Sequence, residues 1–221
     1  MRSVFLFFLF TLTLTATAQI NKLDIGAEGG FSLASLRGNE VIDSYHDTRI
    51  GYSGGLFVQY NFRKIISVRT GGYYERKGSS LEFLFTDING TIIGTFKGKE
   101  NFNYLTVPLL VRATFGQKLN YFVNAGPYIG FLMKKTEYTE AFQSIPEITS
   151  DQTDLFKKTE TGLSFGIGVS YTLKEKFALS FEARNNLGLT DTSDLPVINN
   201  GVIKTNAVNF LFGFSYKLGQ R

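Results

Sequence analysis

Large apolar residues recur at every second position in eight separate stretches of this chain. In the last stretch, every second residue from Val208 to Leu218 is aliphatic or aromatic, whereas Asn209, Gly213 and Lys217 lie between them. A period of two is that of a β-strand, whose successive side chains point to opposite faces. The pattern therefore predicts an all-β protein whose strands each have two unlike faces.

The eight stretches are separated by gaps that are alternately long and short. We predict strands over residues 22–33, 51–61, 65–76, 103–115, 120–133, 160–172, 177–187 and 205–218. Short turns are expected at 61–65, 116–119 and 173–176, and long loops at 34–50, 77–102, 134–159 and 188–204. Each strand has the ~9–11 residues with which a tilted strand crosses the hydrocarbon layer. Bacterial outer-membrane barrels have short turns on the periplasmic side and long loops outside the cell.

Charged residues in the predicted strands fall on the face opposite the large apolar one. This face carries four acids and three arginines: Asp24, Glu28, Arg69, Glu75, Arg112, Glu182 and Arg184. In a soluble eight-stranded cup, the apolar face would line a cavity, and the face in water would carry some charge on every strand. Here the charged face is also rich in Gly, which suits an interior, and the other face has essentially no charge over its centre. The pattern instead favours an eight-stranded antiparallel up-and-down transmembrane β-barrel with its apolar face in lipid.

A barrel of eight strands has an interior that side chains fill. The seven charged residues are therefore expected to form a lumen charge network, because an isolated buried charge costs several kcal/mol and arginine–carboxylate pairs satisfy many donors. A wide diffusion pore is not expected. A rearrangeable network that conducts ions or small solutes is the alternative.

Three local features refine the strand prediction. Asn89-Gly90 favours a primed turn, which predicts a hairpin within 77–102 that projects above the membrane. Pro108 and Pro127 lie in adjacent predicted strands, and because proline removes a ladder donor we expect a bulge or local bend there. Aromatic residues near the strand ends fit interfacial girdles: Tyr52, Tyr60, Tyr74, Tyr104, Tyr121, Tyr171, Phe177 and Tyr216.

The N-terminus has the pattern of a cleaved secretory signal peptide. Arg2 precedes an apolar stretch over 4–14, and Ala16-Thr17-Ala18 forms an A-x-A cleavage pattern. We therefore expect a signal peptide over 1–18 and an outer-membrane barrel domain over 19–221, in a chain exported to the outer membrane. The 221 residues include no Cys, which excludes disulfides and Cys-based metal sites. The net charge of +4 comes without any run of Lys or Arg, so nucleic acid is not expected as a partner.

The chain offers little that resembles a catalytic or cofactor site. Its one histidine, His46, lies near Ser44 and Asp47 in a predicted loop, but catalysis requires groups that converge in space. Gly166 and Gly168 have no following helix and so do not form a nucleotide-binding turn. The acids of 134–159 lack the regular spacing of a calcium loop. No catalytic residue, cofactor or metal site is therefore predicted.

Several motifs of the chain resemble the PorT-type outer-membrane β-barrel proteins of Bacteroidetes, a porin-family group. The motifs lie at Ile25–Phe31, Tyr73–Gly78, Tyr104–Arg112, Asn124–Tyr128 and Thr161–Gly168. The resemblance covers the chain after residue 18 and implies the barrel fold and the outer membrane. It implies little about activity, since the group is described as porin-like and some members serve protein secretion or gliding.

Three functions remain open at this stage. The first is a non-catalytic barrel that stabilises the membrane or binds a partner through 77–102 and 134–159, linked to secretion or envelope maintenance. The second is a narrow porin-like channel for ions or small solutes, and the third is an enzyme whose site lies in the loops around His46. The expected partners are outer-membrane lipid and envelope or secretion proteins, and the barrel is expected to be a monomer.

Overall fold

A computed structural model describes residues 22–40, 42, 46–86, 88–141, 146–174, 176–197 and 201–218. The predicted signal peptide, 1–18, lies outside these residues. The described part contains nine strands and the short 3-10 turn η2, Thr153–Leu155. The strands are β1 Leu23–Arg37, β2 His46–Asn61, β3 Ile66–Thr86, β4 Ile92–Gly116, β5 Leu119–Thr139, β6 Ile148–Asp151, β7 Thr159–Leu173, β8 Phe177–Gly188 and β9 Lys204–Leu218.

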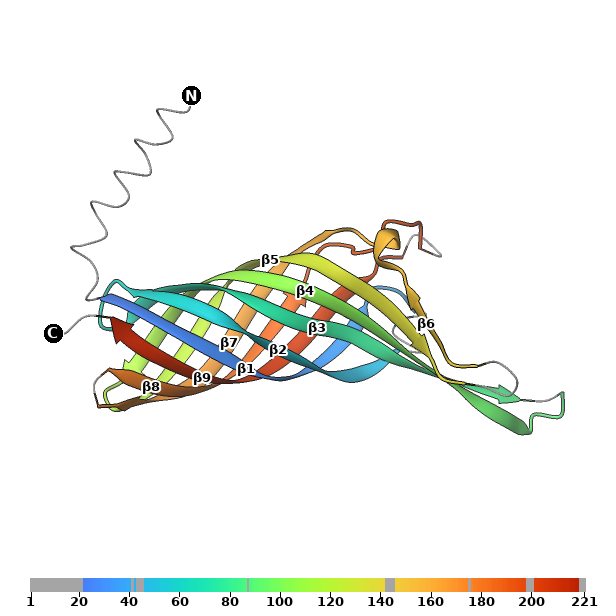
Figure 1. Ribbon diagram of the computed structural model, residues 1–221, viewed down its shortest axis with the longest axis horizontal. Coiled ribbons are helices and arrows are strands. Elements are labelled where there is room, and N and C mark those ends of the chain that lie inside the picture. Colours follow the sequence, from blue (N-terminus) through green and yellow to red (C-terminus); the bar gives the residue numbers. More distant parts are fainter. Residues whose placement is uncertain are drawn as a thin grey trace, which may run out of the picture.

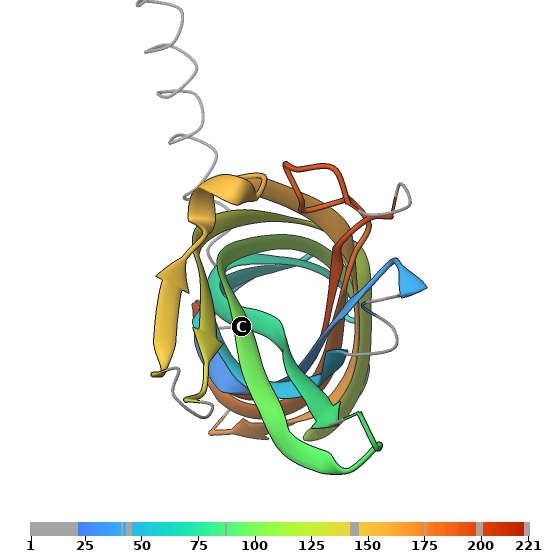
Figure 2. The ribbon, with the colours of Figure 1, turned by 90° about the vertical axis from the view of Figure 1, so that its right-hand side faces the viewer.

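Eight of these strands close into a ring. Every neighbouring pair is antiparallel, from β1–β2 around to β8–β9, and β9 pairs with β1 to complete the ring. The short β6 lies outside the ring, against β5. Figures 1 and 2 show the resulting cylinder of tilted strands from the side and along its axis. The predicted eight-stranded antiparallel barrel is confirmed.

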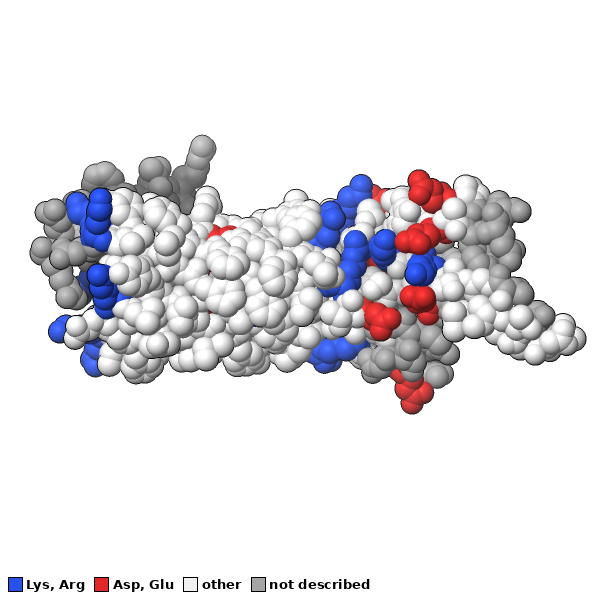
Figure 3. All heavy atoms as spheres, turned by 90° about the horizontal axis from the view of Figure 1, so that it is seen from below, with Lys and Arg blue, Asp and Glu red and all other residues white. Residues whose placement is uncertain are grey.

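The outer wall of the cylinder carries a belt of exposed apolar side chains. In β1 and β2, Phe31 and Leu56 are exposed, whereas Ser32 and Phe57, one position on, are buried. Figure 3 shows a broad and almost wholly uncharged belt across the middle of the face drawn, with most charged side chains at its two ends and only small patches of acidic atoms visible between them. Such an area of exposed hydrocarbon is stable in lipid and not in water. No helix among the described residues is long and apolar enough to cross a membrane.

Several segments predicted as loops are in fact strand. Residues 77–86 and 92–102 continue β3 and β4, and they pair as far as Thr86 and Ile92. The predicted hairpin is thus confirmed, and it projects beyond the rest of the molecule (Figure 1). In the same way, β1 extends to Arg37, β5 to Thr139, and β2 begins at His46. We call the end of the barrel with this projection the loop end and the opposite end, where β1 begins and β9 ends, the turn end.

The prolines do not create the expected bulge. Both strands run through, and the β4–β5 register is the same on either side, from Pro108 opposite Tyr128 to Val111 opposite Ala125. The register shift lies nearer the loop end, opposite Asn103 and Tyr104. The carbonyl of Pro108 accepts a hydrogen bond from Thr70 Oγ1 at 2.8 Å, so a side chain from the neighbouring strand takes part where the ladder is interrupted.

Candidate functional site: the closed lumen

Inward-facing charges from five of the ring strands, β1, β3, β4, β7 and β8, meet in the lumen. We call the group nearest the turn end the arginine layer: Glu28, Arg69, Arg112, Glu182 and Arg184. Each belongs to a strand whose alternate residues are large and apolar, so the alternation that covers the outer wall also fixes these side chains inward. All five are buried.

Two carboxylates hold three guanidinium groups in the arginine layer. Glu182 lies 2.8 Å from Arg112, 2.5 Å from Arg184 and 3.8 Å from Arg69. Glu28 lies 2.9 Å from Arg69 and pairs with Arg184. Each arginine therefore meets at least one carboxylate. Because the lumen is narrow and buried, this mutual pairing is what makes the charges tolerable there.

Aromatic rings pack against the same guanidinium groups. The carbon of the Arg69 guanidinium lies 3.7 Å from the Phe57 ring centroid, and that of Arg112 lies 3.7 Å from the Phe122 ring centroid. Both rings are inward-facing and buried. Stacking of planar guanidinium groups on rings fills space that would otherwise admit water, and it adds a cation–π attraction.

A second group of charges lies next to the arginine layer on the side of the loop end. This lysine layer consists of Glu75, Lys77 and Glu160, all fully buried. Lys77 Nζ pairs with Glu160 and lies 3.5 Å from Glu75. Neutral side chains donate further hydrogen bonds to the two carboxylates. Glu75 accepts from Thr106, Asn186 and Asn209 at 2.7–2.9 Å, and Glu160 accepts from Thr205 at 2.8 Å.

The two layers have opposite formal excesses of charge. The arginine layer has three cations and two anions, and the lysine layer has one cation and two anions. The layers are linked along β8, where Arg184 belongs to the first and Asn186, two residues on, contacts Glu75 of the second. Together they leave no net charge in the middle of the barrel, which suits a low-dielectric interior.

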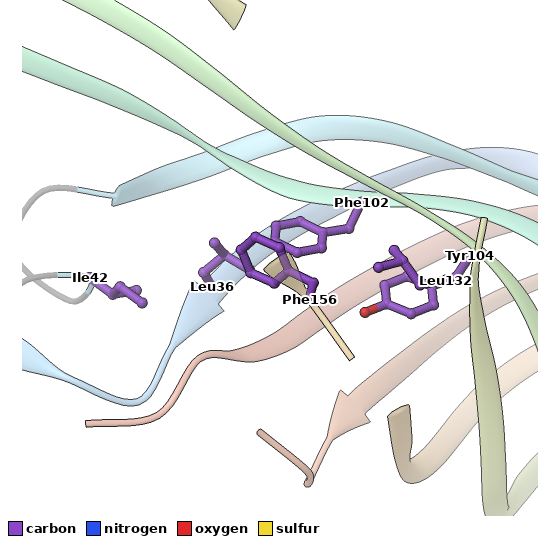
Figure 4. Packing of buried hydrophobic residues seen from close by; sticks show 6 residues of the cluster. All are labelled: Leu36, Ile42, Phe102, Tyr104, Leu132 and Phe156. Atoms are coloured by element: carbon purple, nitrogen blue, oxygen red, sulfur yellow. The ribbon is translucent and has the colours of Figure 1, made fainter. Parts of the chain in front are cut away.

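An apolar cap covers the lysine layer at the loop end. It is formed by Leu36, Ile42, Phe102, Tyr104, Leu132 and Phe156 (Figure 4). Phe102 and Phe156 meet edge to face with centroids 5.0 Å apart. Ile42 and Phe156 come from the segments between strands, so the cap joins those segments to the barrel wall. Tyr104 faces inward and is fully buried, which corrects its predicted place in an outer girdle.

A buried lysine borders the cap. Lys135 Nζ lies 4.9 Å from the Phe156 ring centroid, 3.1 Å from Glu100 Oε1 and 2.5 Å from Gln152 Oε1. Its side chain is only 1% exposed. Lys135 therefore ties β5 to β4 and to the segment that carries η2, and it seals the margin of the cap with a satisfied cation.

The structure brings together five of the seven residues predicted for the lumen network. Glu75 lies instead in the lysine layer, and its cationic partner is Lys77. Asp24 lies apart, where its carboxylate accepts hydrogen bonds from Asn61 at 3.1 Å and from Gln59 at 3.5 Å. The sequence prediction missed Lys77 as a lumen residue because it ended that strand at residue 76. The alternation Tyr73, Glu75, Lys77 was the signal that could have found it.

The residues proposed for a loop enzyme are only partly described. The side chain of His46 and all of Ser44 lie outside the described residues, and Asp47 is exposed on β2. Within the described ranges, no group of three His, Cys, Asp or Glu residues has the arrangement of a metal site. Two surface hollows, of about 700 and 310 Å³, lie on the outer wall rather than in the lumen.

The sequence matches a family model over most of its length. The outer membrane protein beta-barrel domain matches residues 17–194. The chain belongs to this family. The match agrees with the closed ring and apolar belt, and the protein is therefore an outer-membrane β-barrel protein. No curated protein matches the chain.

Solved structures of outer-membrane barrels are similar to this member of the family only at low identity. Neisserial surface protein A is 13% identical with a TM-score of 0.48, over 88% of this chain and 96% of that one. A major outer membrane protein from Thermus thermophilus is 14% identical with a TM-score of 0.46, over 88% and 98%. The outer membrane protein OprG from Pseudomonas aeruginosa is 13% identical with a TM-score of 0.43, over 89% and 96%.

Proposed function

We propose that this protein is a non-catalytic outer-membrane barrel with a closed lumen, which acts by presenting its loop end to a partner in envelope maintenance or secretion. The observation that carries this proposal is the stack of arginine layer, lysine layer and apolar cap. Tyr104, Lys77 and Phe122, among the largest side chains that are fully or almost fully buried, lie in or beside these three groups. A lumen filled in this way by buried side chains fits a closed barrel better than a channel.

The contact surface in this proposal is the β3–β4 projection together with residues 134–159. At the tip of the projection, Leu84 and Ile92 are well exposed and Ile88 is fully exposed. Figure 3 shows the projection as an uncharged extension beyond the charged loop end. Exposed apolar residues at the end of a rigid hairpin are typical of a surface that binds another molecule.

The PorT-type resemblance and the signal peptide are part of the same proposal. Cleavage after Ala18 would release residues 19–221 as the exported barrel. The resemblance supports a role beside secretion components, because some PorT-type proteins serve secretion. Sequencing the N-terminus of protein purified from outer membranes tests the cleavage, and a mature chain that still begins at Met1 would contradict it.

Conductance in planar bilayers tests the closed lumen. Folded protein, recognised by migration on gels that changes with boiling, is expected to give no stepwise current. Reproducible single-channel steps from such protein would replace the proposal with the narrow channel.

Shortening the projection tests the contact surface. Replacing residues 84–95 with Asn-Gly removes the exposed tip, places the turn between the paired residues Phe83 and Phe96, and keeps the pairing of Glu82 with Lys97. The barrel is expected to keep its heat-modifiable migration, whereas cross-links from the loop end to other envelope proteins in intact cells should disappear. A matched variant, Asp194→Asn, changes an exposed residue between β8 and β9, outside this surface, and should retain the cross-links. Equal cross-linking in both would contradict the proposal.

A further inference from the structure

Two arginines lie at the loop-end margin of the apolar belt without a carboxylate partner among the described residues. The Arg76 guanidinium carbon lies 4.8 Å from the Tyr52 ring centroid, and its Nε donates to Asn103 Oδ1 at 3.0 Å. Arg49 Nη1 donates to the main-chain carbonyl of Glu100 at 3.1 Å. Both guanidinium groups are thus positioned by neutral acceptors, which leaves their charge unmatched.

The two arginines are also on neighbouring strands, because β2 and β3 pair on either side of them, at Thr48 with Ser79 and at Ser53 with Glu75. Two lysines in the same region do have carboxylate partners: Lys99 lies 3.2 Å from Glu140, and Lys134 lies 3.5 Å from Asp151. On this side of the barrel, Arg49 and Arg76 are therefore cations whose charge no described carboxylate matches. Figure 3 shows basic side chains of the loop end directly beside the uncharged belt.

Below these arginines the outer wall is hollowed. Tyr52 and Tyr74 stack with centroids 5.9 Å apart at the margin of the belt. Farther into the belt lies the hollow of about 700 Å³, which begins at Leu56 and Gly72 and extends toward the turn end as far as Val58 and Tyr216. Leu56 pairs with Gly72, which is four residues from Arg76 along β3, a distance of about 13 Å.

We propose that Arg49 and Arg76 bind the phosphate of a lipid in the leaflet at the loop end, and that an acyl chain of this lipid lies in the hollow. Guanidinium groups match phosphate with paired hydrogen bonds, and a phosphate supplies the missing negative charge. The distance from Arg76 to the near edge of the hollow is close to half the thickness of the hydrocarbon core, about 15 Å, which an acyl chain of the same leaflet spans. The lipid site does not depend on the closed lumen or on a protein partner.

Native mass spectrometry of the full barrel, released from detergent, tests the site. The probes are phosphatidic acid, diacylglycerol with the same chains, and inorganic phosphate. We expect phosphatidic acid to be retained, diacylglycerol to be retained at least about tenfold more weakly, and millimolar inorganic phosphate not to displace the lipid. Equal retention of the two lipids, or displacement by inorganic phosphate, would overturn the proposal.

Matched variants separate the headgroup contact from the chain contact. Arg49→Gln with Arg76→Gln should weaken retention of phosphatidic acid at least about tenfold, whereas Lys157→Gln with Lys158→Gln removes the same charge elsewhere and should not. Gly72→Leu has room, since an added Cβ would lie 3.9 Å from Leu105, and should weaken retention by filling the hollow. Ala125→Leu adds bulk to another part of the wall as its control.

Folding of each variant is checked by heat-modifiable migration. If the double glutamine variant does not fold, Arg49→Lys with Arg76→Lys keeps the charge but loses the paired geometry, and it should show intermediate retention. Wild-type retention in the folded glutamine variant would overturn the phosphate site. Wild-type retention in Gly72→Leu would overturn the assignment of the chain to the hollow.

Discussion

At the scale of single residues, the lumen contains buried charged side chains that form ion pairs mainly with one another. Glu182 is the clearest case, because three guanidinium groups and the Asn124 amide converge on its two oxygens. Arginine suits this role better than lysine, since its planar fork serves two acceptors at once and also stacks on a ring. Removing one charged side chain of the arginine layer is therefore expected to lower the free energy of unfolding by more than removing one from a typical surface ion pair.

The variant Glu182→Gln tests this expectation. It leaves three buried guanidinium groups with the single carboxylate of Glu28, and we expect the free energy of unfolding to fall by about 3–5 kcal/mol. Urea unfolding in detergent, followed by gel migration, measures the change. Glu82→Gln is the control, because Glu82 and its partner Lys97, 3.8 Å away, are both about half exposed, and that pair should contribute about 0–1 kcal/mol. Equal effects of the two variants would contradict the role of the arginine layer.

Lys77 offers a second test at this scale. Lys77→Met removes the one ammonium group between Glu75 and Glu160 and should destabilise the barrel by about 3–5 kcal/mol. Adding Glu160→Gln removes one of the two negative charges that Lys77→Met leaves unpaired. The free energy of unfolding of the double variant should therefore be higher, by about 1–3 kcal/mol, than the sum of the two single effects predicts. Strictly additive effects in the same unfolding measurement would show that the contact contributes no coupling.

At the scale of strands, the segments beyond the apolar belt are fixed by contacts among themselves rather than by lipid. Asp191, in the segment between β8 and β9, shows how. Its Oδ1 accepts from the amides of Ile203 at 2.8 Å and Ser193 at 3.2 Å, and Lys157 Nζ lies 3.3 Å from its Oδ2. Partial burial raises the pKa of Asp191, but these partners together outweigh it, and the pKa lies below its ordinary value.

This lowered pKa predicts a pH dependence with a definite sign. The carboxylate of Asp191 stabilises the segment fully above the ordinary aspartate pKa of about 3.9, and the stabilisation is lost as the pH falls through the lower value of the folded protein. Hydrogen exchange, corrected for its intrinsic pH dependence, should show the Ser193 and Ile203 amides losing protection in that acidic range. Asp191→Asn should remove the pH dependence, and an unchanged profile in this variant would contradict the assignment.

The strands also show what could be predicted from the sequence and what could not. Period two is clearest where a strand has two unlike faces, so all eight strands were found across the belt, where lipid covers one side. Past Lys77, Gly78 has no side chain and the alternation ends, although β3 continues to Thr86. The arginine layer followed from charge on the inward face, and the lysine layer could have followed in the same way, because Glu75 and Glu160 lie within predicted strands and Lys77 continues the alternation after Glu75. Phe156 lies between strands, in a segment whose course no local pattern specifies.

At the scale of the whole molecule, the three obstructions lie in series along the barrel axis. A solute from the loop end meets the apolar cap first, then the lysine layer, then the arginine layer. Removing the cap alone should therefore admit water and small reagents as far as the lysine layer without opening a path through the barrel. This separates access from conduction, which a single measurement of current does not.

The chain contains no Cys, so one introduced thiol can report access to the lumen. Ala207 is fully buried on β9 opposite Asn186, whose side chain contacts Glu75 of the lysine layer. In Ala207→Cys, a charged methanethiosulfonate reagent should react slowly, and adding Phe102→Ala with Phe156→Ala should accelerate the reaction strongly. The same uncapped barrel should still pass no current in planar bilayers. Fast labelling with the cap intact would show that the cap does not seal the lumen, and current through the uncapped barrel would show that the two charged layers do not block it.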